Sequence, residues 1–294
     1  MNRLAELLGA GRPVLLDGGM GTLLQDSGLE DGAPGELWNL ENPEAVRAAH
    51  AAYADAGARV LTTNTFGGTR PRLDMHGLGD RLAEVNREAA RLARSVADER
   101  GLLVAGDLGP TGELLAPLGT MTPDEAQALF AEQLAALVEG GIDLVLIETL
   151  SDLGEADAAL AAARQVAPDL PVAVTMSFDT NLRTMMGVRP AEAVAHLAAA
   201  GADAAGANCG RGPQEMELIA AELVKVRTDD LLLVAQSNAG LPQVVGDHFE
   251  YDASPAELAA HATRLAELGI DLVGGCCGST PAHVAAIRAT LVPS

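Results

Sequence analysis

Residues 122–148, TPDEAQALFAEQLAALVEGGIDLVLIE, contain the pattern of one helix followed by one strand. Thr122 is a favourable N-cap, a proline takes the first helical position, and acids fill the first turn. A Gly-Gly pair then ends the helical pattern. The apolar run 144–148 is bounded by turn residues and is typical of a buried parallel strand. The stretch therefore predicts one unit of an α/β fold.

The same unit recurs along the whole chain. The eight predicted strands cover residues 14–17, 60–64, 102–106, 144–148, 172–176, 204–208, 231–235 and 272–275. A doubly wound open sheet is the alternative, but residues 17–21 (DGGMG) lack the GxGxxG spacing of a dinucleotide site. Eight unbroken β/α units instead predict an α/β protein with a single (β/α)8 TIM barrel, and we expect residues 1–294 to form one domain.

The composition argues against several classes of function. The 294 residues suit one α/β barrel, and 48% of them are hydrophobic, enough for a large core. A net charge of −22 repels phosphate backbones, so we expect no nucleic-acid partner. No apolar run is long enough to span a membrane, and residues 1–13 lack the apolar region of a signal peptide. We therefore expect a cytoplasmic protein whose N-terminal segment is part of the fold.

The three cysteines form a poor disulfide set, because their number is odd and two of them are adjacent. Cys209 ends the sixth predicted strand, and Cys276 and Cys277 end the eighth, so all three reach the rim where barrel sites lie. These strands are one strand apart, about 10 Å at the backbone. Side chains can close that gap around one zinc ion with Zn–S bonds of about 2.3 Å. The alternative is that the cysteines are ordinary buried core residues.

Three thiolates would leave the fourth position of a tetrahedral zinc ion open, as in catalytic sites. A thiol substrate bound there would lose its proton and become a nucleophile at neutral pH. The cysteines thus predict alkyl transfer to sulfur. The other polar residues at predicted strand ends are Asp17, Asn64, Thr65, Glu148 and Asn238.

From about residue 14 to 287 the chain resembles the homocysteine S-methyltransferases. This family includes the homocysteine-binding module of cobalamin-dependent methionine synthase and the enzymes that use betaine or S-methylmethionine. The segments that carry the resemblance are LDGGMGT (16–22), TNTF (63–66), GPTG (109–112), IET (147–149), NC (208–209), NAGLP (238–242) and GGCCG (274–278).

The resemblance implies a zinc ion on the three cysteines, with the homocysteine thiolate as fourth ligand. It implies that Asp17 and Glu148 receive the substrate ammonium, and that Gly18 and Gly19 offer backbone N–H groups to its carboxylate. The alternatives are a helix or turn cap for Asp17 and a buried ion pair within the barrel for Glu148. Asn238 is predicted either to fill the open metal position before substrate binds or to form an Asx turn.

The methyl donor is predicted from aromatic residues, because onium groups favour aromatic cages. Betaine-using relatives have an aromatic residue where this chain has Thr149, and they have a tyrosine after the position of Phe66. We therefore expect S-methylmethionine or a corrinoid- or folate-linked donor rather than betaine. The aromatic residues predicted at the catalytic face are Trp38, Phe66, Phe178, Phe249 and Tyr251; the predicted donor pocket consists of Trp38, Phe66, Thr149 and Phe178.

The segment 238–242 resembles the module of cobalamin-dependent methionine synthase. We expect no corrinoid-binding domain within these residues, so such a donor would need a separate corrinoid protein as partner. Two alternative functions stay open. One is a corrinoid-partner methyltransferase that acts on another thiol or on an onium methyl compound, and the other is a zinc-binding barrel without catalysis.

Overall fold

The computed structural model describes residues 2–9, 11, 13–30, 32–179, 181–245 and 248–291, and its centre is one parallel eight-stranded sheet. The sheet order is β1-β10-β7-β6-β5-β4-β3-β2. A bridge between Leu16 and Val60 joins the two outer strands of this order, so the sheet closes on itself. The predicted (β/α)8 barrel is confirmed. Its strands are β1 (Val14–Leu15), β2 (Val60–Thr62), β3 (Leu103–Leu108), β4 (Leu144–Leu150), β5 (Val172–Met176), β6 (Ala204–Cys209), β7 (Leu232–Ser237) and β10 (Leu272–Gly275).

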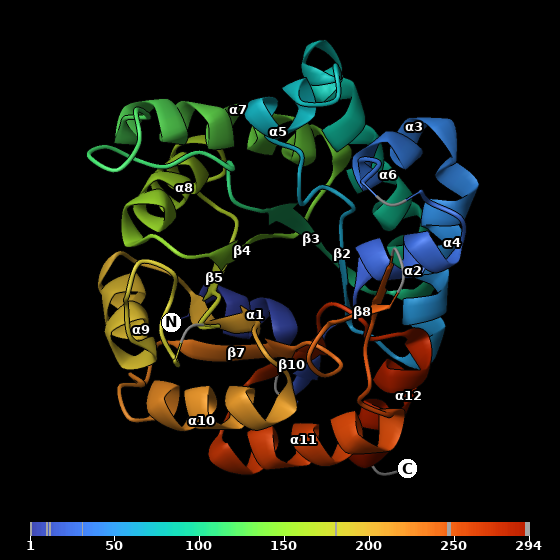
Figure 1. Cartoon of the computed structure of the whole chain (residues 1–294), viewed down its shortest axis with the longest axis vertical. Coiled ribbons are helices and arrows are strands. Elements are labelled where there is room, and N and C mark those ends of the chain that lie inside the picture. Colours follow the sequence, from blue (N-terminus) through green and yellow to red (C-terminus); the bar gives the residue numbers. More distant parts are fainter. Residues whose placement is uncertain are drawn as a thin grey trace.

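Helices surround the sheet, as the view down the barrel in Figure 1 shows. Among the described residues, eight of them follow the eight barrel strands in turn along the chain. Their starts follow the predicted caps: Thr122 and Ser254 each form a capping box with a glutamate three residues later. The helix ends at Gly57 and Gly269 have positive φ, which glycine adopts without strain. The surrounding helices are α4 (Pro43–Ala56), α6 (Leu82–Arg100), α7 (Pro123–Gly140), α8 (Leu153–Val166), α9 (Pro190–Ala199), α10 (Pro213–Val224), α11 (Pro255–Leu268) and α12 (Pro281–Leu291).

Short elements are inserted between the strands and the surrounding helices. A two-stranded antiparallel hairpin follows β7 and was not predicted, since its short strands lie in a segment that has no clear alternation. The inserted elements are α2 (Met20–Asp26), η1 (Gly35–Leu37), α3 (Trp38–Glu41), α5 (Arg70–Asp74), η2 (Gly79–Arg81), β8 (Gln243–Val245) and β9 (His248–Glu250).

Two strands run further than predicted, and both extensions affect the site. Strand β3 continues past Gly106 to Leu108, which brings Asp107 into the barrel. Strand β4 continues past Glu148 to Leu150. Its register against β5 advances three residues from Ile147 to Leu150 while β5 advances only two, so β4 has a bulge at this point.

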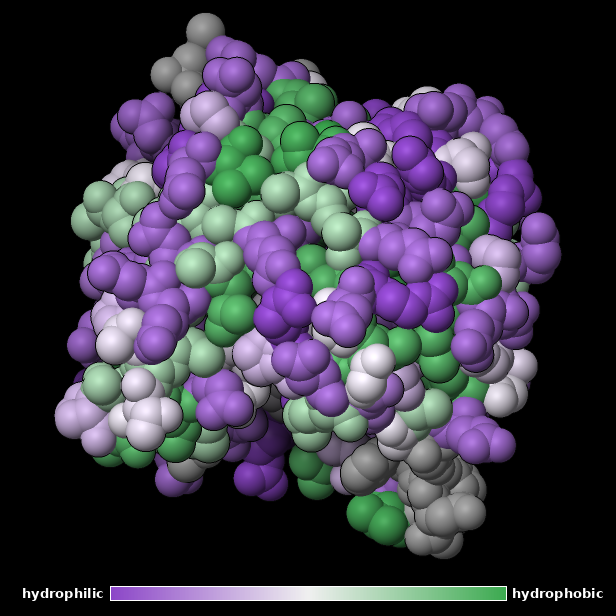
Figure 2. Space-filling view, turned by 90° about the horizontal axis from the view of Figure 1, so that it is seen from above, coloured by the Kyte–Doolittle hydropathy of each residue, from purple (hydrophilic) through white to green (hydrophobic). Residues whose placement is uncertain are grey.

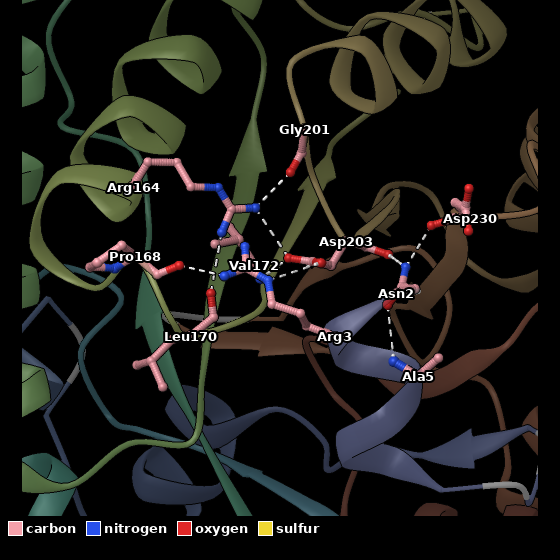
Figure 3. Close-up of polar contacts among 10 residues, drawn as sticks. All are labelled: Asn2, Arg3, Ala5, Arg164, Pro168, Leu170, Val172, Gly201, Asp203 and Asp230. Carbon is pink, nitrogen blue, oxygen red and sulfur yellow. Dashed lines mark hydrogen bonds and ion pairs between the residues drawn. The ribbon is translucent and has the colours of Figure 1, made fainter.

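The N-terminal helix α1 (Arg3–Leu8) packs against the end of the barrel where the strands begin, and Figure 3 shows the polar contacts made by Asn2 and Arg3 there. The side-chain amide of Asn2 donates hydrogen bonds to the carbonyl oxygens of Asp203 and Asp230, both at 2.6 Å. Arg3 donates to the carbonyl oxygen of Pro168. Leu4 is fully buried among the apolar residues that fill the barrel interior. The expectation that this segment belongs to the fold is thus met for its described residues; Met1, Ala10 and Arg12 lie outside them.

The face of the molecule drawn in Figure 2 carries both polar and apolar side chains. Figure 2 shows hydrophilic side chains spread over one side of the molecule, with smaller hydrophobic groups between them. Among the described residues, no helix combines the length and apolar character needed to cross a membrane.

We predict that Leu4→Ala lowers the free energy of unfolding by about 2–5 kcal/mol, because it leaves a cavity where α1 meets the barrel interior. Leu7→Ala on the same helix is the matched control. Leu7 is 38% exposed, so its truncation is expected to cost less than about 1 kcal/mol. Urea unfolding of both variants measures the difference, and equal losses would show that α1 does not pack as described.

Candidate metal centre and substrate cavity

A cavity of about 280 Å³ lies at the carboxyl ends of the strands. Residues at the ends of seven of the eight strands line it, together with residues of α2 and η1. A larger hollow of about 740 Å³ lies near Val14 and Leu8, at the other end of the barrel, and contains none of the predicted site residues. The predicted metal-binding cysteines and the predicted acids therefore lie at the carboxyl ends of the strands, where active sites of such barrels are found.

The three cysteines meet at the rim of this cavity. Cys209 is the last residue of β6, while Cys276 and Cys277 directly follow β10. The Sγ atoms of Cys209 and Cys276 are 2.9 Å apart, and all three Sγ atoms lie within 4.8 Å of one another. This convergence makes them the one group of metal-binding side chains found among the described residues. None of the three forms a disulfide.

The strand register explains why the cysteines meet. Cys209 of β6 and Gly275 of β10 are both paired with Ser237 of the intervening strand β7. The N–H of Cys276 donates to the carbonyl oxygen of Ser237 at 2.8 Å. This bond keeps Cys276 and Cys277 at the same height in the barrel as Cys209. The predicted arrangement of the two cysteine-bearing strands around a third is therefore confirmed.

The thiols differ in acidity. The pKa of Cys277 falls to about 3, because hydrogen bonds from the thiols of Cys209 and Cys276, and a weaker one from the Tyr251 hydroxyl, stabilise its thiolate. Hydrogen bonding to its two neighbours and burial raise the pKa of Cys276. Three thiolates so close together repel one another, so a cation between them is needed to keep all three deprotonated.

Asn238 connects the loops that carry the cysteines. Its Nδ2 donates to the carbonyl oxygen of Gly210 at 2.8 Å, and its Oδ1 accepts from the N–H of Cys277 at 3.0 Å. The accepted N–H is far away in sequence, so this contact is not an Asx turn. Asn238 is 6% exposed and does not line the cavity. These two contacts join the loops that carry the cysteines, and the occupation of the open metal position by Asn238 stays a prediction.

Four carboxyl groups line the cavity near the cysteines. Asp17 accepts hydrogen bonds from the N–H and the hydroxyl of Thr62, at 2.6 and 2.7 Å, and is 2% exposed. Burial raises its pKa to about 6 despite these bonds. Burial, followed by the charges of Cys277 and Asp17, raises the pKa of Glu148 to about 8. Glu148 forms no ion pair among the described residues, which argues against its role as half of a buried ion pair.

Asp107 and Glu36 were not predicted as site residues. Asp107 is 3% exposed, and its Oδ1 has no hydrogen-bond partner in the part of the chain that the structure describes. Burial, and then the charges of Glu148 and Glu36, hold its pKa well above the ordinary value. Glu36 of η1 accepts a hydrogen bond from the N–H of Gly67 at 2.5 Å. The cavity is therefore rich in acids, which favours a cationic group.

The glycine turn lies directly against the cysteine loop. A Cβ atom on Gly19 would lie 2.7 Å from the carbonyl oxygen of Cys276, so only glycine fits there. Both Gly18 and Gly19 line the cavity. The N–H of Gly19 already donates to the carbonyl oxygen and hydroxyl of Ser279, both at 3.2 Å. Of the two predicted N–H donors, only that of Gly18 has no partner among the described residues.

The four residues predicted for the donor pocket do not come together. Phe66 and Thr149 line the substrate cavity. Phe178 is 1% exposed and packs in the main hydrophobic core, and Trp38 packs against the apolar cluster around Leu24. Of the other two aromatic residues, Tyr251 contacts Cys277, while the side chain of Phe249 lies outside what the structure describes.

The sequence and the structure match proteins of known activity. The chain is 34% identical to methionine synthase from Mycobacterium leprae over 298 residues, and 34% identical to that from Mycobacterium tuberculosis over 296 residues. These alignments cover 96% and 95% of this chain but only 24% and 25% of the relatives. The chain thus spans about a quarter of the length of these curated relatives.

A solved structure matches this chain over nearly all of its residues. The metallated form of the homocysteine methyltransferase MmuM from Escherichia coli superposes with a TM-score of 0.82 at 27% identity, covering 98% of this chain and 99% of MmuM. Its oxidized form gives a TM-score of 0.81. The family model described as "Homocysteine S-methyltransferase" matches residues 14–291. Together with the geometry of the site, this match shows that the chain belongs to the homocysteine S-methyltransferase family.

Proposed function

We propose that the protein transfers a methyl group to the thiol of homocysteine and so forms methionine, with a zinc ion held by Cys209, Cys276 and Cys277. The observation that carries this proposal is the convergence of three thiols at the edge of an acid-rich cavity. Thiol donors select zinc among the common metals, and three of them leave one tetrahedral position for a substrate.

The observed sulfur positions fit such an ion. Zn–S bonds of about 2.3 Å in tetrahedral geometry place the sulfurs about 3.8 Å apart. The Sγ atoms of Cys209 and Cys276 are 2.9 Å apart, and all three Sγ atoms lie within 4.8 Å of one another, so shifts of about 1 Å bring them to this spacing. When bound, the zinc ion supplies Lewis acidity, which lowers the pKa of the homocysteine thiol.

The protein's own side chains would orient the substrate. Homocysteine carries an ammonium group, and Glu148 and Asp17 line the cavity as its predicted acceptors. Asp107 adds a third carboxyl group, whose Oδ1 has no hydrogen-bond partner among the described residues. Binding of an ammonium relieves the repulsion among these acids and holds them deprotonated. The substrate carboxylate would meet the glycine turn, where the N–H of Gly18 is available.

We expect purified protein to contain about one zinc ion per chain, which a chelator removes. Alanine substitution of Cys209, Cys276 or Cys277 should abolish stoichiometric zinc and methyl transfer but leave the far-UV circular dichroism unchanged, because the barrel core does not depend on the rim. Metal analysis of the three variants decides the matter. If all three variants retained zinc, the ion would have to bind elsewhere.

Glu148→Gln should weaken homocysteine binding by roughly 2–4 kcal/mol, because a buried ammonium loses its charged partner. Zinc content should stay unchanged, since Glu148 is not among the three ligands. The exposed Glu192, for which the described part of the chain offers no ion pair, provides Glu192→Gln as the control. Calorimetric titration with homocysteine measures both variants, and an unchanged affinity in Glu148→Gln would leave Glu148 with a structural role only.

We further propose that the donor is S-methylmethionine or a methyl group delivered on a corrinoid or folate by a separate protein, and not betaine. The structure supports this choice by what surrounds the cavity. Phe66 is the one aromatic residue among its described lining residues. A second cavity of about 290 Å³ shares Thr149 with the first, and Leu114, Met185 and Met186 contribute to its lining. Such surroundings provide no cage for a trimethylammonium group.

A partner that carries the donor would have to reach the same end of the barrel. Several large apolar side chains are exposed on loops that follow the strands there. Leu114 and Leu118 lie between β3 and α7, Met185 lies between β5 and α9, and Val244 lies in the hairpin after β7. The methionine synthase relatives are about four times longer than the matched region, which leaves room in those proteins for further modules.

A methyl-transfer assay with homocysteine tests the donor. Each ring of a cage contributes roughly 0.5–2 kcal/mol, so two missing rings cost betaine about one to three orders of magnitude in affinity. We expect betaine to be slower than both S-methylmethionine and methylcobalamin, with S-adenosylmethionine as a fourth comparison. A fastest rate with betaine would contradict the role assigned to Thr149. Formation of no methionine with any donor, by protein that contains zinc, would instead favour a barrel without catalysis.

A further inference from the structure

Asn208 lies where the metal centre and the substrate cavity meet. It is fully buried and precedes Cys209 in β6. Its Oδ1 accepts hydrogen bonds from the N–H of Thr149 and from the hydroxyl of Thr175, both at 2.9 Å. Its Nδ2 donates to the hydroxyl of Thr149 at 2.6 Å. The same Nδ2 lies 3.5 Å from the Sγ of Cys209 and 3.8 Å from that of Cys276.

The orientation of this amide follows from its partners. The N–H of Thr149 can only donate, so the atom that faces it must be the oxygen of Asn208. The NH2 group therefore faces the two sulfurs. An N–H group that points at a thiolate withdraws charge from it and restricts its position, as groups around metal ligands commonly do.

The residues that Asn208 connects have unusual backbones. Thr149 lies in the β4 bulge with φ 62°, and Cys209 has φ 60°. Such angles are strained in residues other than glycine, and they persist only where the surroundings hold them. Glu148 is the neighbour of Thr149, so the bulge that Asn208 holds also sets the direction of the predicted ammonium acceptor.

We propose that Asn208 is a positioning residue that couples the two halves of the site. Its oxygen holds the β4 bulge, and with it Glu148, while its NH2 group holds the sulfurs of Cys209 and Cys276. Because the amide is planar and rigid, the bulge and the sulfurs cannot move independently. The proposal rests on the proposed function for its consequence in homocysteine binding, but the coupling itself is a property of the chain.

Other residue types can reproduce only part of this contact. Aspartate keeps an oxygen toward Thr149 but has no N–H for the sulfurs, and it adds a charge that repels them. Leucine fills a similar volume without any polar atom. Serine is too short to reach both sides. Substitutions of Asn208 can therefore test its contact with Thr149 separately from its contact with the sulfurs.

The first experiment measures the bulge alone and needs neither metal nor substrate. Amide hydrogen exchange at residues 147–151 should be faster in Asn208→Leu, and in Asn208→Ala if the leucine variant does not fold. Asn208→Asp should keep wild-type protection, because it retains the accepting oxygen. Asn86→Leu is the matched control. Asn86 is equally buried and donates to the carbonyl oxygens of Gly68 and Leu82, away from the cysteines.

The second experiment measures the sulfurs with cobalt(II) as the probe metal. All three Asn208 variants should shift the sulfur-to-cobalt charge-transfer band and bind the metal about 10- to 100-fold more weakly by chelator competition. Titration of that band with homocysteine should show at least about tenfold weaker binding in Asn208→Leu than in wild type. Asn86→Leu should lower thermal stability but leave the band and both affinities unchanged.

The outcomes separate this proposal from the proposed function. Unchanged exchange at residues 147–151 in Asn208→Leu, or in Asn208→Ala where the leucine variant does not fold, would overturn the coupling, as would an unchanged cobalt band in every folded Asn208 variant. If wild-type protein took up no cobalt, the proposed function would fail, and the exchange result would still decide whether Asn208 holds the bulge.

Discussion

The register of three adjacent strands is the constraint on which this site depends. Cys209 and Gly275 are both paired with Ser237, so two segments that are distant in sequence present thiols at the same level of the barrel. A slip of one residue in either pairing would turn a cysteine away from the cavity, because neighbouring side chains in a strand point to opposite faces. The register is in turn held by apolar packing inside and outside the barrel. The metal centre is thus a consequence of the fold rather than of a local cysteine motif.

The sequence predicts this arrangement because parallel strands have a simple relation between order and space. Once eight strands are recognised, closure of the barrel places the ends of β6 and β10 on either side of β7. This strand order is enough to predict that the three cysteines meet. The same reasoning places Asp17 and Glu148 at the mouth. It fails at Asp107, because a carboxylate after Gly106 resembles the start of a turn, whereas in the structure it is a buried part of β3.

The residues in loops were less predictable for a physical reason. Inside a strand, alternation determines which side chains face the core, but a loop has no such period. Trp38 and Phe178 were therefore placed at the donor pocket by their position after strands, and the structure packs both against apolar clusters instead. Glu36 was missed on the same grounds. Its place in the cavity depends on η1 and on the N–H of Gly67, which local sequence does not reveal.

The negative charge of the cavity links the cysteine cluster to the acids beside it. Four carboxyl groups and three thiols lie in one partly enclosed space, and burial raises the pKa of Asp17, Asp107 and Glu148. Such a cluster is unfavourable by itself, because each negative charge opposes the formation of the next. A divalent metal at the sulfurs and an ammonium at the acids would each reduce that repulsion. The two sites would then assist one another electrostatically: a cation at either one makes the remaining groups easier to deprotonate. A zwitterionic thiol is the kind of molecule that contacts both, since its sulfur and its ammonium are separated by a short aliphatic chain. The strained backbones of Thr149 and Cys209 also bear on how this site is prepared for its ligands. The contacts that maintain these strained backbones would also hold Glu148 and the Cys209 thiol in position before any ligand arrives, so that less binding energy is needed to assemble the site.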